Sequence, residues 1–134
     1  IGATGFVGTA LLNELLQRGH RVTALARDPA KIPSREGLTV VQADATDAAQ
    51  VAQAVQGVDA VASAYNPGWT HPDLHDEFLR GSRAITAGVK AAGVQRLLVV
   101  GGAGSLYVAP GVQLVDTPSS RPNGKTAHWP PAKR

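Results

Sequence analysis

Three glycines near the start of the chain, Gly2, Gly5 and Gly8, stand three residues apart in the segment IGATGFVG. A glycine-rich turn between a strand and a helix can hold a pyrophosphate, because glycines permit the tight turn, the close approach of the phosphates and the packing of helix on strand. A helix beginning near Phe6 would direct free N–H groups at the anion, and Thr4 adds a hydroxyl. A purely structural turn is the alternative, since the spacing differs from G-x-G-x-x-G.

An arginine follows the first predicted strand after this motif. Residues 22–26 lead into Arg27 and Asp28, about 20 residues beyond the third glycine, where ribose recognition is expected. An acidic residue there binds the ribose hydroxyls of NAD, whereas an arginine suits the 2′-phosphate of NADP, because its charged fork binds in a bidentate manner. Arg27 therefore favours NADP over NAD, and the alternative is an ordinary solvated arginine beside Asp28.

One pattern recurs along the chain: a helix, a glycine, a short polar step and an apolar run. Gly19, Gly57 and Gly93 stand where a helix C-terminus needs a left-handed residue. Short runs rich in Val, Leu and Ala are typical of parallel strands buried on both faces. The predicted strands are residues 22–26, 38–42, 60–64 and 97–100.

Helical periodicity alternates with these strands. Leucines at positions 11, 12, 15 and 16 form one apolar stripe, and Asp47 with Gln50 resembles a capping box before a second helix. A third helix is predicted from about Pro72 to Ala92, with glycines that would bring it close to the sheet. The alternation predicts an α/β fold, a doubly wound parallel sheet.

The composition narrows the possible functions. The chain has 134 residues and no cysteine, which excludes disulfides and thiolate chemistry. Residues 117–134 are basic and rich in proline, so we expect a domain over residues 1–116 and a disordered tail over 117–134. The domain itself is close to neutral, which argues against nucleic acid as a partner. No apolar run spans a membrane, and a cytoplasmic location is the default expectation.

Several segments together resemble the atypical short-chain dehydrogenase/reductase group, and within it the NAD(P)H-binding proteins of the NADH-flavin reductase type. The resemblance runs from Ile1 to about Pro118. It rests on IGATGFVG, LARDPAKI, VVQADATD, AYNPGW, EFLRGSRAITAGVKAAGVQRLLVVGGAGSL and VAPGVQLVDTP. It implies a Rossmann-type fold and a bound nicotinamide dinucleotide.

The resemblance also assigns residues to the cofactor. Asp44, with Ala45 beside it, would meet the adenine amino group, although Asp44 could instead cap the next helix. Ala64 and Tyr65 would flank the ribose and nicotinamide. The other implied cofactor residues are Gly2, Thr4, Gly5, Phe6, Val7 and Gly8 around the pyrophosphate, Arg27 at the 2′-phosphate, and Gly101 and Gly102 at the closing side of the site.

The chain departs from that family at both ends. Family members have an apolar strand before the first glycine, where only Ile1 stands here. With this first strand largely missing, we expect a gap in the sheet that exposes backbone groups. The likeness also stops near Ser119, which suggests a partial gene product.

No residues match the Tyr-x-x-x-Lys pair of the classical short-chain enzymes, because Trp69 follows Tyr65 and Gly111 follows Tyr107 at that spacing. Reduction of a flavin or quinone needs less, since the cofactor supplies the hydride. Ser105 and Tyr107 are the candidate catalytic residues, or else simply part of a polar loop.

The segment NPGWTHPDLHDEF holds His71 and His75 at a spacing that metal sites use, but we predict no metal, because the acidic residues suit a helix start. Trp69 is expected to cover the nicotinamide side. The predicted function is a NAD(P)H-dependent reductase of a small-molecule acceptor. The alternatives are a non-catalytic NAD(P)-binding sensor and an inactive fragment, and the oligomeric state stays open.

Overall fold

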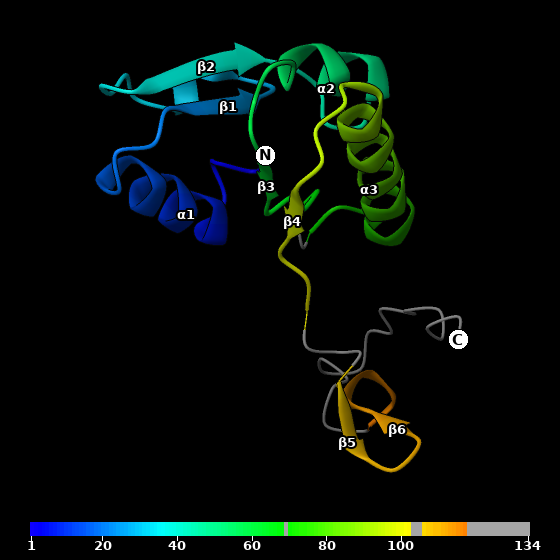
Figure 1. Cartoon of the computed structure of the whole chain (residues 1–134). Coiled ribbons are helices and arrows are strands. Elements are labelled where there is room, and N and C mark those ends of the chain that lie inside the picture. Colours follow the sequence, from blue (N-terminus) through cyan, green and yellow to red (C-terminus); the bar gives the residue numbers. More distant parts are fainter. Residues whose placement is uncertain (69, 103–105, 118–134) are drawn as a thin grey trace. The chain divides into compact units, whose positions relative to one another are not determined.

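The computed structural model describes residues 1–68, 70–102 and 106–117 (Figure 1). The chain divides into two compact units, Ile1–Val100 and Gly101–Arg134. The elements of the first unit are α1 (Phe6–Gln17), β1 (Val22–Ala26), a 3-10 turn η1 (Pro29–Lys31), β2 (Leu38–Gln42), α2 (Ala48–Ala54), β3 (Val61–Ser63), α3 (Leu74–Ala91) and β4 (Leu97–Val99).

The strands of the first unit pair in parallel. β1 lies beside β2 from Val22 opposite Leu38 to Ala26 opposite Gln42. β3 lies beside β4, with Val61 opposite Leu97. β1 and β2 have the bounds that the sequence predicts, 22–26 and 38–42.

Helices cover both faces of β1. Its consecutive side chains point to opposite faces of the sheet. Leu25 belongs to a core cluster with Val51 of α2 and Ile85 of α3, whereas Ala24 lies in a second cluster with Leu12 of α1. This arrangement confirms the predicted α/β class with helices on both sides of a parallel sheet.

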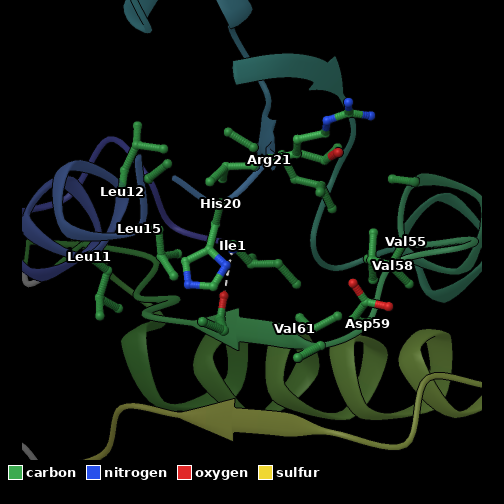
Figure 2. Close-up of a pocket in the computed structure, with 18 of the residues that line it drawn as sticks. Ile1, Leu11, Leu12, Leu15, His20, Arg21, Val55, Val58, Asp59 and Val61 are labelled. Atoms are coloured by element: carbon green, nitrogen blue, oxygen red, sulfur yellow. Dashed lines mark hydrogen bonds between the residues drawn. The ribbon is translucent and has the colours of Figure 1, made fainter. Parts of the chain in front are cut away.

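A gap separates the two pairs of strands, as the sequence predicts. β1–β2 and β3–β4 form separate two-stranded sheets. Ile1 lies against β3: its amino group donates to the carbonyl oxygen of Ala62 at 2.8 Å, and its carbonyl oxygen accepts from the N–H of Ala64 at 2.9 Å. A cavity of about 640 Å³ lies between β1 and β3, and Figure 2 shows apolar side chains of α1, including Leu12, on its wall.

The glycines that end the helices behave as predicted, whereas a glycine inside α3, Gly88, packs against another element than the predicted one. Gly19, Gly57 and Gly93 have φ of +81°, +76° and +76°, the left-handed conformation of a C-terminal cap. A methyl group on Gly88 would lie 2.7 Å from the carbonyl oxygen of Ala48. Gly88 therefore lets α3 approach α2, and not the sheet as expected.

The second unit contains a hairpin that the sequence analysis did not predict. β5 (Tyr107–Ala109) pairs antiparallel with β6 (Val112–Gln113), and the 3-10 turn η3 (Leu114–Asp116) follows. Gly111, with φ of +74°, stands in the turn between the strands. Residues 118–134 of the predicted tail lie outside the described residues. Within the described ranges, no helix is long and apolar enough to cross a membrane.

Candidate functional site

The glycine motif forms a tight turn that leads into α1. Gly2 has φ of +83°, and the N–H of Gly5 donates to its carbonyl oxygen at 3.1 Å. A methyl group on Gly2 would lie 2.6 Å from the carbonyl oxygen of Ala64, and one on Gly8 would overlap the carbonyl oxygen of Gly2. Gly2 and Gly8 are therefore required by packing, because backbone lies where a side chain would begin.

The beginning of α1 has the properties of an anion site. Gly5 is its N-cap, no side chain caps it, and its first turn holds no acidic residue. The first N–H groups of a helix have no partner inside the helix, and the dipole adds positive potential there. Phe6 is 97% exposed and Val7 42%, so neither side chain covers the turn. The geometry can receive a phosphate group.

A cavity of about 240 Å³ opens beside this turn and brings together residues from separate parts of the sequence. It joins the turn, the ends of β1 and β2, the segment after β3 and the start of α3. The lining residues are Ile1, Gly2, Thr4, Leu25, Ala26, Arg27, Ala43, Asp44, Ala45, Thr46, Tyr65, Asn66, Pro67, His71, Glu77 and Arg80.

Part of the predicted cofactor set meets at this cavity: Gly2, Thr4, Arg27, Asp44, Ala45 and Tyr65 line it. The neighbouring residues Gly5, Phe6, Val7 and Gly8 of the turn and the start of α1 are not among its lining residues. Ala64 does not line the cavity, but its carbonyl oxygen lies close to Gly2. Gly101, Gly102 and Tyr107 belong to the second unit and are not among the residues that line this cavity. Ser105, like Trp69, lies outside the described residues.

Asp44 forms its own turn with Thr46. Its Oδ1 accepts from the N–H of Thr46 at 2.9 Å and from the Thr46 hydroxyl at 2.7 Å. These two bonds lower the pKa of Asp44, the positive charges of Arg27 and Arg80 lower it further, and partial burial opposes them. Asp47, and not Asp44, caps α2, because its side chain accepts from Ala49 and Gln50. Asp44 therefore stays ionised at the cavity wall.

Replacing Thr46 by Val should raise the pKa of Asp44, because the hydroxyl that donates to Oδ1 is lost. Because the pKa of Asp44 is lower in the folded state than in the unfolded state, its ionised form stabilises the fold at pH values above the unfolded-state pKa. This stabilisation is lost as the pH falls through the folded-state pKa. Carboxyl NMR titration should show the rise in Thr46→Val and no change in Thr39→Val, which alters the exposed face of β2. An unchanged pKa of Asp44 in Thr46→Val would contradict the assignment.

Tyr65 also lines the cavity. Its hydroxyl donates to the carbonyl oxygen of Glu77 at 3.2 Å, and its ring stacks on Phe78 with centroids 6.3 Å apart. Burial raises the pKa of Tyr65, and the negative charge of Glu77 adds to this effect. The hydroxyl is thus bound to backbone and stays protonated.

Arg80 is the main cavity residue that the sequence analysis missed. Its Nη1 lies 3.3 Å from Oε1 of Glu77, one turn earlier on α3. The Glu-x-x-Arg spacing indicates a helical ion pair, but nothing in the sequence shows that this face of α3 turns toward Arg27 and Asp44. The fold alone brings a second arginine to the cavity.

The histidines make local contacts. Nδ1 of His71 accepts from the N–H of Asp73 at 3.1 Å, and Nδ1 of His75 lies 3.1 Å from Oδ1 of Asp76. Within the part of the chain that the structure describes, His, Cys, Asp and Glu side chains form no group of three or more that could hold a metal ion. The two histidine ring contacts are thus with neighbouring residues at the start of α3.

Comparison with known proteins gives this cavity a context. A protein from Bacillus subtilis (strain 168), YwnB, of uncharacterised function, is 39% identical over 122 residues, which are 88% of this chain and 54% of that protein. Cinnamoyl-CoA reductase 1 from Oryza sativa subsp. japonica is 31% identical over 118 residues, covering 81% of this chain and 35% of the reductase. The crystal structure of a candidate epimerase from Bacteroides thetaiotaomicron superposes with a TM-score of 0.78 at 49% identity, covering 87% of this chain and 52% of that one.

The chain thus spans about half the length of YwnB and of the Bacteroides protein. The family model described as NAD(P)H-binding matches residues 2–124, which include the glycine turn, the cavity and both pairs of parallel strands. Together with the parallel α/β architecture, this match shows that the chain belongs to the NAD(P)H-binding family, with a Rossmann-type fold and the nicotinamide cofactor that defines the family.

Proposed function

We propose that this chain binds NADPH in preference to NADH, with the 2′-phosphate at Arg27. The observation that carries the proposal is the convergence of the glycine turn, Arg27 and Asp44 on one cavity. Asp28, the acidic residue nearest to Arg27 in the sequence, accepts from the N–H of Ala30 at 3.1 Å and caps η1. Its carboxylate is thus engaged locally, which leaves the guanidinium of Arg27 as the charged group at the end of β1.

The cavity and the glycine turn beside it offer positions for the rest of the dinucleotide. The beginning of α1 and the hydroxyl of Thr4 suit the pyrophosphate. Asp44 suits the exocyclic amine of adenine, because an ionised carboxylate only accepts hydrogen bonds. The bound nicotinamide would supply the hydride, while these residues bind and orient the dinucleotide.

We further propose that the reaction is the reduction of a planar acceptor such as a flavin or quinone. The support is the resemblance to NADH-flavin reductases and the lack of a Tyr-x-x-x-Lys pair. A carbonyl substrate, which the name of the rice reductase suggests, would need a proton donor. The hydroxyl of Tyr65 is already bound to the carbonyl oxygen of Glu77.

Titration of the purified chain with NADPH and NADH, followed by nicotinamide fluorescence, tests the proposal. Saturable binding with NADPH the tighter ligand is expected, and no binding of either would overturn it. NADPH oxidation is then compared with FMN, a benzoquinone and a cinnamoyl thioester as acceptors. Turnover with the first two is expected. Binding without turnover on any acceptor would favour a NAD(P)-binding sensor instead.

A further inference from the structure

A close contact joins α3 to the segment that follows β3. Gly81 is buried on α3 and faces the ring of Tyr65. A methyl group at position 81 would overlap Cε1 and Cζ of that ring and would lie 2.6 Å from its Oη. Any side chain at position 81 therefore requires Tyr65 to move.

One turn of α3 holds the ring of Tyr65 in three ways. Gly81 provides the space, the carbonyl oxygen of Glu77 accepts from the hydroxyl, and Phe78 stacks on the ring with an interplanar angle of 25°. Glu77 and Gly81 are four residues apart and thus share a face of the helix. The position of Tyr65 is consequently fixed by α3.

The backbone of Tyr65 in turn lies against the glycine turn. A methyl group on Gly2 would lie 2.6 Å from the carbonyl oxygen of Ala64 and 3.0 Å from the nitrogen of Tyr65. Gly8 then touches Gly2 from the α1 side. Close approaches at Gly81, Gly2 and Gly8 thus link α3, through Tyr65, to the start of α1.

We infer that Tyr65, seated on Gly81, is a positioning residue that sets the glycine turn and the cavity wall for the dinucleotide. The inference rests on the proposed cofactor site and assigns Tyr65 no part in proton transfer. Its hydroxyl is used by the backbone of Glu77, and its raised pKa opposes ionisation at neutral pH. Displacing the ring should move Gly2, and with it the N–H groups that meet the phosphates.

The test is Gly81→Ala, with Gly88→Ala as the matched control. Both glycines are buried on α3, and a methyl group on Gly88 would lie 2.7 Å from both the Ala48 carbonyl oxygen and Cβ of Val51, away from Tyr65. Both variants should lower the melting temperature. Gly81→Ala alone should weaken NADPH binding, by about tenfold, measured at low temperature on the folded protein. Equal affinities in the two variants would overturn the inference.

A double-mutant cycle separates positioning from general damage to the fold. In a Tyr65→Ala background the ring is gone, so Gly81→Ala should change NADPH affinity by less than about twofold. Tyr65→Phe keeps the ring and should retain wild-type affinity within about threefold. Additive losses from Tyr65→Ala and Gly81→Ala would contradict the role, and Tyr65→Ala provides this test even if Gly81→Ala does not fold.

The position of the ring can also be followed without cofactor. The chain has two tyrosines, so Tyr107→Phe leaves Tyr65 as the single tyrosinate signal in a pH titration by absorbance. Gly81→Ala should shift the pKa of Tyr65 back toward its ordinary value, and Gly88→Ala should not. An unmoved pKa in Gly81→Ala would refute the contact. If the wild-type chain binds no dinucleotide, the proposed function is wrong, and the positioning role is wrong with it. The tyrosine titration still tests the contact between Gly81 and the ring of Tyr65 in that case.

Discussion

Alanine in place of Gly8 is expected to lower the free energy of unfolding by about 2 kcal/mol and to remove measurable NADPH binding. The reason is steric, because the new methyl group would overlap the carbonyl oxygen of Gly2. Relief requires α1 to move away from the turn, which also moves the N–H groups that would meet the phosphates. Urea denaturation and NADPH fluorescence titration measure the two effects.

Gly5→Ala is the matched substitution inside the same motif. A methyl group there would meet only the carbonyl oxygen of Gly2, at 3.5 Å, an ordinary contact, and the φ of Gly5 is −81°. Stability should therefore stay within about 0.5 kcal/mol of wild type. NADPH affinity should still fall by about tenfold, because the methyl group narrows the approach to the phosphates. If Gly8→Ala and Gly5→Ala lowered the free energy of unfolding equally, the assignment of Gly8 to packing and of Gly5 to the ligand would be wrong.

Replacement of Arg27 by Asp is expected to weaken NADPH binding by about 100-fold and NADH binding by less than about threefold. The loss combines the charge-assisted bonds to a 2′-phosphate with a new repulsion between like charges. Competition by 2′,5′-ADP against NADPH should be lost in parallel. Side-by-side titrations with NADPH and NADH measure the change in preference.

Arg83→Asp controls for the change in net charge, because Arg83 is an exposed residue of α3 that does not line the cavity. It should leave the preference for NADPH unchanged. If Arg27→Asp keeps the wild-type preference while Arg80→Gln abolishes it, the 2′-phosphate lies against α3 and the role given to Arg27 is wrong.

Much of the fold could be predicted because its signals are local. The strands 22–26 and 38–42 agree with β1 and β2, and the glycines that end the helices have the expected positive φ. The β5–β6 hairpin was missed, because its strands have three and two residues and show no alternating pattern. The start of α3 was placed two residues early, since Pro72 is as suitable a helix start as Asp73.

The site could be predicted only in part, for a related reason. Thr4 lies within the glycine turn, and Arg27 and Asp44 come just after β1 and β2. The carboxyl ends of parallel strands lie at one edge of the sheet. Arg80 gives no such signal, because its place at the cavity depends on how α3 is rotated about its axis. The cap of α2, by contrast, was predictable, because the Asp47–Gln50 spacing is a local signal and the side chain of Asp47 accepts from Ala49 and Gln50.

The sequence by itself determined the helices and parallel strands of the first unit, the phosphate turn and the residues at the strand ends, because each follows from neighbours a few positions away. Only the tertiary structure decided which glycines are required by packing, that α3 fixes Tyr65 through Gly81, and that a second arginine reaches the cavity. These features depend on close approaches between segments far apart in the chain. At these close approaches, backbone from a distant segment decides whether even a methyl group fits. A local sequence pattern cannot specify where that distant backbone lies.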